Sequence, residues 1–535
     1  MRFAKGGTAS RSSRSRTAAG WRCWLIVELI AAIALAGCAI PGDEDEARSE
    51  VGRPPVVVVV FDEFPADDLL RPDGSIDAER FPNFAKLASI SSWFPNAHAV
   101  YDSTFGAVPA ILDGRTPRAF TAADVRSHKP SMFTVMDQLG YEVFKVESAS
   151  AVCPQDVCPG ALTRRPGVLA RLAGNGRPAR FHKWVGAIRS RSQPDFYFQH
   201  SLMPHEPWLY LPSGHQSRPA GREPIWQVNR EQGFDEPYLS RDNHLRHLLQ
   251  VGFTDRLVGQ LLARLRRTGL LERALIVVTA DHGYAYEIGV PSRRFLRDYN
   301  VEEIAPVPLF IKAPGQMKGK VDESLAANID VLATIADLLN TTVGYKQDGR
   351  SAFSESVKRR RGIAITTRDF THIVRIGLPE LQRRRATWRR RWGRLFGTGA
   401  ESNLLYGDPW ARAYRIGPHR ELLDRRVASL HVRGTGTERP SLLNRSLFAH
   451  VSRRNQVLPT RVTGPLAGVP VGEHLDLALA VNGRIRAVGR SFDFVKQRFE
   501  FFSFMVPEGA LRAGANRIEL FAVRPGGAVE SLGRL

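Results

Sequence analysis

The feature that most constrains the fold is a run of five valines and a phenylalanine, VVVVVF, at residues 56–61. A continuous β-branched run this short is typical of a strand buried on both faces, and such strands occur mainly in parallel sheets. Helical periodicity marks residues 247–269 and 329–340. Further strands are predicted where apolar runs recur, at 141–146, 195–202, 274–280 and 307–312. We therefore expect an α/β domain at about 54–350, with a mostly parallel sheet covered by helices on both faces.

The N-terminus has the pattern of an export signal. Basic residues precede the apolar run WLIVELIAAIALAG, which ends at Cys38. The tetrapeptide LAGC resembles a bacterial lipobox, in which the cysteine is lipidated; the alternative is an uncleaved signal anchor over residues 1–38. An acidic, proline-bounded linker follows at 39–53. We expect the rest of the chain to lie outside the cytoplasm, anchored to a membrane.

The remaining cysteines agree with export. Cys153 and Cys158 form the motif CPQDVC, and a close pair in an exported protein is predicted to form a small disulfide. A metal knuckle is the less favoured interpretation, because no second Cys or His pair lies nearby in the sequence.

The sequence changes character after residue 350. Residues 351–437 form an arginine-rich connector, in which LQRRRATWRRRWGRLFG at 381–397 is either an interfacial helix on anionic lipid or a solvated connector. The net charge of +21 suits an anionic membrane surface or anionic substrates, and nucleic acid is not expected for an exported chain. Residues 438–535 predict an antiparallel β-sandwich, with a type I′ hairpin turn at Asn482-Gly483.

Polar residues follow the predicted strands, where ligands of open α/β sheets bind. Asp62 and Glu63 follow the first strand, and Thr104 lies between the first and second strands. Two more groups follow later strands, namely His205 in MPHEPW, and Asp281 with His282 in TADHGY. Carboxylates, an imidazole and a hydroxyl converging at strand ends predict a divalent-metal site. A bound cation would lower the pKa of the threonine hydroxyl and supply a nucleophile, and a helix beginning there would favour an anionic group.

Each residue also has a structural interpretation. Ser103 or Thr104, opening an apolar run, is typical of a helix N-cap. Asp-Glu after a strand and Asp-His-Gly are common in turns. His205 lies between two prolines and could pack in a rigid loop. The combination in this order favours function.

Four segments resemble the alkaline-phosphatase-like superfamily, in its sulfatase-like and phosphoethanolamine- or phosphoglycerol-transferase-like branch. They are VVVVVFDEFP, TFGAVPAILDG, the DHG tripeptide, and VPLFIKAPGQ followed by IDVLATIADLL and DGRS. The resemblance spans about residues 56–351. Formylglycine sulfatases carry C/S-x-P-x-R, whose first position falls on Thr104 here, and threonine cannot become formylglycine. The spacing T-x-x-x-V-P is instead similar to that of phosphoethanolamine transferases.

The resemblance implies specific roles. Thr104 would be both nucleophile and metal ligand, and Asp62, Asp281 and His282 would complete the metal site, with His205 handling substrate. Whether Glu63 joins or replaces Asp62 stays open. A further histidine expected shortly after DHG is missing, the next being His372. A second metal therefore stays open too, and Arg293 and Arg294 would supply positive charge in its place.

These observations predict an extracytoplasmic, membrane-anchored hydrolase or transferase for phosphate esters on a lipid or glycan. It would act through a phospho-threonine and a divalent metal, namely Mn, Zn, Ca or Mg. The alternatives are a sulfuric ester hydrolase that works without formylglycine, and a non-catalytic glycan-binding protein of the cell envelope.

Overall fold

The computed structural model describes residues 52–535 except 148, 160–175, 221–235, 291 and 494–498. Its largest element is a seven-stranded sheet in the order β3-β4-β1-β5-β6-β2-β7. The strands are β1 (Val56–Asp62), β2 (Ser92–Trp93), β3 (Glu142–Val146), β4 (Asp195–Pro204), β5 (Leu275–Ala280), β6 (Leu309–Lys312) and β7 (Lys320–Val321). Strands β3, β4, β1 and β5 are mutually parallel, whereas β6 is antiparallel to β5. The mostly parallel sheet is confirmed.

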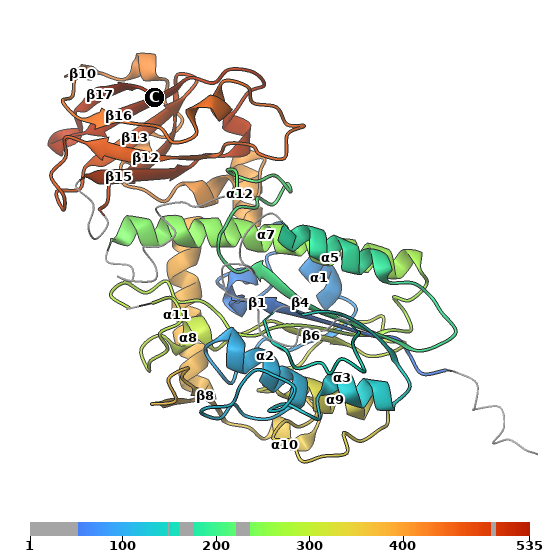
Figure 1. The fold of residues 1–535 in the computed structure, drawn as a ribbon. Helices are drawn as coiled ribbons and strands as arrows, with labels where there is room; N and C mark the ends of the chain where they lie inside the picture. Colours follow the sequence, from blue (N-terminus) through green and yellow to red (C-terminus); the bar gives the residue numbers. More distant parts are fainter. Residues whose placement is uncertain (1–51, 148, 160–175, 221–235, 291, 494–498) are drawn as a thin grey trace, which may run out of the picture. The chain divides into compact units, whose positions relative to one another are not determined.

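Alternate residues of β1 enter two separate cores. Val57, Val59 and Phe61 pack in one core, and Val56, Val58 and Val60 in the other. The first core contains side chains of α1 (Pro82–Ala88), α5 (Gly176–Ala187) and α7 (Pro237–Arg267). The second contains side chains of α2 (Thr104–Asp113), α3 (Met132–Gln138) and α9 (Asp330–Leu338). Figure 1 shows these two helical layers on opposite faces of the sheet. Burial on both faces explains why β1 is uniformly apolar.

The arginine-rich segment is more structured than the term connector implies. It contains the hairpin of β8 (Gly362–Thr366) and β9 (Ile373–Gly377), then α11 (Leu378–Phe396) and α12 (Gly399–Tyr406). The short helix α8 (Val301–Ile304) precedes the segment, and α10 (Glu355–Lys358) lies within it, before the hairpin.

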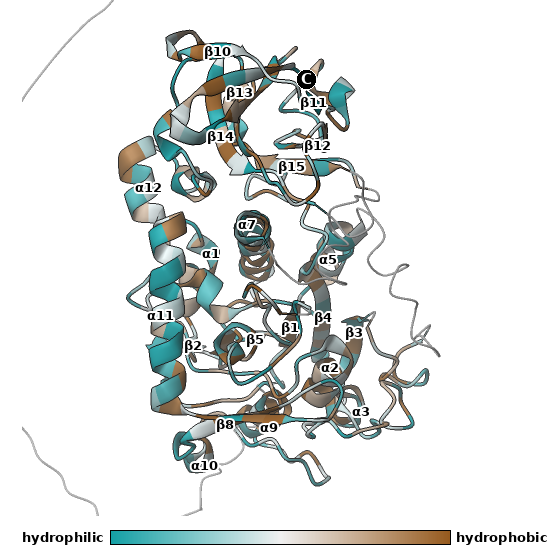
Figure 2. Ribbon diagram, turned by 90° about the vertical axis from the view of Figure 1, so that its left-hand side faces the viewer, coloured by the Kyte–Doolittle hydropathy of each residue, from teal (hydrophilic) through white to brown (hydrophobic). Residues whose placement is uncertain are grey.

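Helix α11 packs its apolar face on the protein. Trp388, Trp392 and Phe396 belong to the first core, and the Trp388 indole donates a hydrogen bond of 2.7 Å to Glu303. Four of its seven arginines are exposed, and Figure 2 shows the ribbon of α11 as largely hydrophilic. The interfacial-helix interpretation is therefore wrong, because the apolar side chains it requires are already buried.

Two further sheets form the C-terminal part. One has the order β10-β17-β16-β13-β14 and the other β11-β12-β15, and their facing residues share one core. The strands are β10 (Val432–Thr435), β11 (Arg439–Pro440), β12 (Arg461–Ala467), β13 (Asp476–Val481), β14 (Arg484–Arg490), β15 (Glu500–Met505), β16 (Ile518–Val523) and β17 (Val529–Arg534). Pairing is antiparallel except between β10 and β17. Asn482 and Gly483 join β13 to β14 with φ of 53° and 76°, as a type I′ turn requires.

Other predictions have mixed outcomes. Cys153 and Cys158 form a disulfide, which fits an oxidising compartment. The export signal and Cys38 lie outside the described residues. Within the described ranges, every helix is too short or too polar to cross a bilayer. The division at residues 350 and 437 stays a prediction.

Candidate active site

Thr104 is the first residue of α2. Ser103 occupies the N-cap position with extended backbone (φ −150°, ψ 141°), and its side chain makes no capping hydrogen bond. The interpretation of Thr104 as the N-cap is therefore wrong, because Ser103 holds that position and Thr104 already belongs to the helix. The Thr104 side chain is instead buried at the positive end of the helix, where it is available for other contacts.

Asp62 and His282 flank the Thr104 hydroxyl. Thr104 Oγ1 lies 3.3 Å from Asp62 Oδ1 and 3.3 Å from His282 Nε2. Asp62 ends β1, and His282 follows β5, the neighbouring parallel strand, so the sheet topology brings both to the same edge. His282 Nδ1 donates to the carbonyl of Gly283 at 2.8 Å, which leaves Nε2 with its lone pair toward Thr104. Burial, reinforced by Arg294, lowers the pKa of His282 to about 3, so the imidazole is neutral.

Asp281 completes the group. Its Oδ1 accepts hydrogen bonds from the backbone N–H of His282 at 2.7 Å and of Glu63 at 3.1 Å. Oδ2 is buried without a hydrogen-bond partner among the described residues. Burial and the neighbouring Asp62 carboxylate raise the pKa of Asp281 well above its ordinary value.

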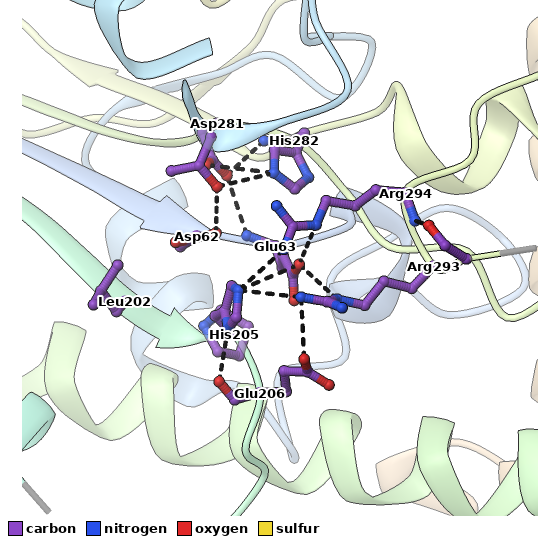
Figure 3. A network of polar contacts seen from close by, with 12 residues as sticks. Asp62, Glu63, Leu202, His205, Glu206, Asp281, His282, Arg293 and Arg294 are labelled. Carbon is purple, nitrogen blue, oxygen red and sulfur yellow. Dashed lines mark hydrogen bonds and ion pairs between the residues drawn. The ribbon is translucent and has the colours of Figure 1, made fainter. Parts of the chain in front are cut away.

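Glu63 has different partners from Asp62. Its backbone is left-handed, with φ of 59°, which is uncommon for a residue other than glycine. Glu63 Oε1 forms ion pairs with Arg293 at 2.8 Å and Arg294 at 2.9 Å (Figure 3). Although burial favours the neutral acid, these arginines hold the pKa of Glu63 well below its ordinary value. Arg293 also pairs with Glu206 at 3.1 Å. The positive charge expected beside the nucleophile is therefore largely neutralised by Glu63 and Glu206.

His205 contacts Glu63 and the same two arginines. Its Nδ1 donates to the Glu206 carbonyl, and its Nε2 lies 3.4–3.5 Å from Arg293, Arg294 and Glu63. Burial and the two arginines keep the pKa of His205 well below its ordinary value. His372 precedes β9 and is exposed, so it adds no buried imidazole.

One buried histidine escaped sequence analysis. His200 lies within β4, and its Nδ1 is 3.1 Å from Glu147 Oε1, just beyond β3. Its Nε2 lies 3.9 Å from Asp62 Oδ2. The available signal was the polar pair Gln199-His200 inside an otherwise apolar strand.

A basic cavity of about 510 Å³ adjoins the nucleophile segment. Ser103, Phe105 and Gly106 line one side, and Arg115 and Arg368 contribute cationic groups, as does Arg118. This composition suits an anionic ligand.

The donor set fits a divalent cation. The side-chain donor atoms of Asp62, Glu63 and His282 lie within 4.8 Å of one another, as do those of Asp62, His200 and Asp281. Several buried donor atoms lack hydrogen bonds within the part of the chain described, including Asp281 Oδ2 and His200 Nε2. Unpaired buried carboxylate oxygens are costly unless a cation satisfies them. Asp62, Thr104, Asp281 and His282 are the residues that would hold it near the nucleophile.

In sequence, the chain is 28% identical to arylsulfatase K of Bos taurus over 103 residues, or 19% of this chain and 18% of that protein. It is 28% identical to N-acetylglucosamine-6-sulfatase of Homo sapiens over 184 residues, or 30% of this chain and 32% of that protein. These alignments therefore span less than a third of the length of either relative.

Among solved structures, the phosphonate monoester hydrolase of Silicibacter pomeroyi matches with a TM-score of 0.39 and 19% identity, covering 58% of this chain and 79% of that one. An alkaline phosphatase superfamily protein of Vibrio parahaemolyticus matches with a TM-score of 0.38 and 14% identity, covering 61% and 75%. The family model described as Sulfatase matches residues 54–341, which is more than half of the 535 residues. The chain belongs to the sulfatase family, a group of hydrolases within the alkaline phosphatase superfamily.

Proposed function

We propose that this protein cleaves phosphate esters by nucleophilic attack of Thr104, transferring the phosphoryl group to water or to another alcohol. One observation carries the proposal, namely that Thr104 Oγ1 lies 3.3 Å from both Asp62 Oδ1 and His282 Nε2. A threonine that only caps a helix has no need of a buried carboxylate and a neutral imidazole at its hydroxyl.

The chemistry follows from these groups. A divalent cation bound by Asp62, Asp281 and His282 would lower the pKa of the Thr104 hydroxyl and so favour the alkoxide. Thr104 Oγ1 forms a bond to phosphorus, and the bond from phosphorus to the leaving alcohol breaks. The N-terminus of α2 presents its positive end to the attacked anion. Water or an acceptor alcohol then attacks the phospho-threonine and restores Thr104.

Two features support an anionic substrate larger than the ester itself. The basic cavity beside Ser103 offers Arg115, Arg118 and Arg368 to further negative groups. Arg294 is more exposed than Arg293, with 14% of its side chain accessible compared with 4%, so it is the better placed of the two for contact with substrate. We propose a lipid or glycan phosphodiester as the substrate class.

A second candidate function is sulfate-ester hydrolysis through the same hydroxyl. The names of both sequence relatives favour it, since each is called a sulfatase. Threonine at position 104 counts against it, because formylglycine cannot form from threonine.

The site would work outside the cytoplasm. The disulfide between Cys153 and Cys158 supports this location. Lipidation of Cys38, which would hold the enzyme at a membrane surface, is part of the proposal.

The test is intact-mass and peptide analysis after incubation with phosphodiesters and, separately, with sulfate esters. With a phosphodiester, we expect an adduct on the peptide that contains Thr104. Thr104→Ala should abolish the adduct and lower turnover by orders of magnitude, whereas Thr104→Ser should retain some of both. Thr387→Ala, an exposed threonine on α11, is the matched control and should behave as wild type.

An adduct with sulfate esters alone would replace the first candidate by the second. Full turnover by Thr104→Ala would refute both candidates. Absence of turnover and adduct in wild type with both ester classes would favour the non-catalytic glycan-binding alternative.

A further inference from the structure

The two oxygens of Asp62 face different groups. Oδ1 lies 3.3 Å from Thr104 Oγ1, on the side of His282. Oδ2 lies 3.9 Å from His200 Nε2. The nucleophile uses only the first oxygen, so the second needs an explanation of its own.

His200 is held in one orientation by Glu147. Glu147 accepts hydrogen bonds from the backbone N–H of Ala149 at 2.7 Å and of Ser150 at 2.8 Å, and from the Ser150 hydroxyl at 2.7 Å. A carboxylate surrounded by donors acts as an acceptor for His200 Nδ1–H as well, at 3.1 Å. The other nitrogen, Nε2, therefore carries the lone pair.

Among the described residues, that lone pair accepts no hydrogen bond. The His200 side chain is 0% exposed, and its Nε2 makes no hydrogen bond to any residue that the structure describes. Asp281 Oδ2 is buried in the same condition. Leaving two such acceptors in the interior costs free energy that an apolar side chain would avoid, unless a cation lies between them.

We propose that His200, Asp62 and Asp281 form a second, inner cation position, with Asp62 and Asp281 shared between it and the position at Thr104. Their donor atoms lie within 4.8 Å of one another, which allows one ion to contact all three. A histidine whose other ring nitrogen is fixed by a carboxylate is the usual arrangement of a metal-binding imidazole. One imidazole and two carboxylates favour Zn²⁺ or Mn²⁺ over Ca²⁺, which prefers oxygen ligands alone.

The inner position answers a question that the sequence left open. The histidine expected shortly after DHG is missing, and His200 supplies an imidazole from β4 on the other side of Asp62. This inference rests on the metal site of the proposed function, because Asp62 and Asp281 belong to both positions.

Metal counting tests it without a substrate. The full chain is stripped with a chelator, titrated with Zn²⁺, freed of excess ion, and analysed for zinc per polypeptide by mass spectrometry. We expect two ions for wild type and one for His200→Ala. We also expect one ion for His282→Ala, because this variant loses only the position at Thr104. Glu147→Gln should still bind two at saturation, with the inner ion held about 10–100-fold more weakly because the imidazole is no longer oriented.

His98→Gln is the matched control. His98 is also buried, and its Nδ1 has no hydrogen bond within the described ranges, but it belongs to neither cluster. It should retain two ions, as wild type does.

The ion counts distinguish failure of the inner position from failure of the metal site in the proposed function. One ion in wild type, lost in His282→Ala and kept in His200→Ala, refutes the inner position alone. Two ions in His200→Ala refute it as well. No ion in wild type refutes the metal site of the proposed function together with the inner position. If His200→Ala fails to fold, the count for wild type and the affinity for Glu147→Gln decide the matter.

Discussion

Replacing Arg385 by methionine should show how firmly α11 is attached to the catalytic core. Arg385 binds Asp67 through two hydrogen bonds of 2.7 and 3.0 Å, and it donates another of 2.8 Å to the carbonyl of Pro95. The side chains of Arg385 and Asp67 are 3% and 1% exposed. Removing one partner of a buried ion pair costs about 3–5 kcal/mol, because the other charge is left uncompensated. Arg389 still contacts Asp67 at 2.8 Å, so the lower end of that range is expected.

The assay is thermal unfolding followed by circular dichroism. At about 2.1 cal/mol/K per residue, the unfolding entropy of the unit Gly52–Leu535 lowers Tm by roughly 1 °C for each kcal/mol of stability lost. Arg385→Met should therefore lower Tm by about 3 °C. Arg383→Met, on the same helix but 70% exposed, is the control and should change the free energy of unfolding by less than about 0.5 kcal/mol. Equal shifts for the two variants would refute the inference that α11 is attached through Asp67.

Two further predictions concern pH and the nucleophile helix. Burial, with Arg360 nearby, lowers the pKa of His98 to about 3, so the native state stays neutral where the unfolded state takes up a proton below about pH 6.5. Stability should therefore fall by about 2 kcal/mol from pH 7 to pH 5 on account of His98. His98→Gln should remove this loss of stability, so its Tm should fall less between pH 7 and pH 5 than that of wild type. Parallel profiles of Tm against pH for the two proteins would contradict the prediction. A Cβ at Gly106 would lie 2.5 Å from the ring of Tyr101, so Gly106→Ala should displace the first turn of α2 and lower turnover about tenfold to a hundredfold. Gly186→Ala, with open space around the added methyl, should leave turnover unchanged, and an equal loss in both variants would remove the steric argument.

The sheet and much of the site could be predicted because parallel strands place their ends together. The valine run of β1 indicated burial on both faces, and Asp62, Asp281 and His282 meet because β1 pairs with β5. A strand end recognised in the sequence thus locates its polar residues without any knowledge of their partners.

Other features depend on contacts that no local pattern encodes. Glu63 meets Arg293 across 230 positions of sequence, so this ion pair could not be foreseen. His200 was hidden because a single imidazole within a hydrophobic strand has the same local pattern whether it packs or binds a metal. The spacing of Trp388, Trp392 and Phe396 fixed an apolar helical face but could not say whether lipid or protein covers it.

Helix α7 gives the C-terminal sheets a mechanical connection to the site. At its start, the Tyr238 hydroxyl donates to the carbonyl of Ser503 on β15 at 2.7 Å. Further along the same helix, Gln250 donates to the carbonyl of His205 at 2.9 Å, and His247 Nε2 lies 3.0 Å from the carbonyl of Glu63. Helix α7 is continuous over 31 residues, so a displacement at one end is transmitted to the loops that carry Glu63 and His205. Removal of the C-terminal sheets would therefore remove one of the contacts that hold α7, and through it Glu63 and His205, in position. A truncated protein should keep another surface packed against Tyr238.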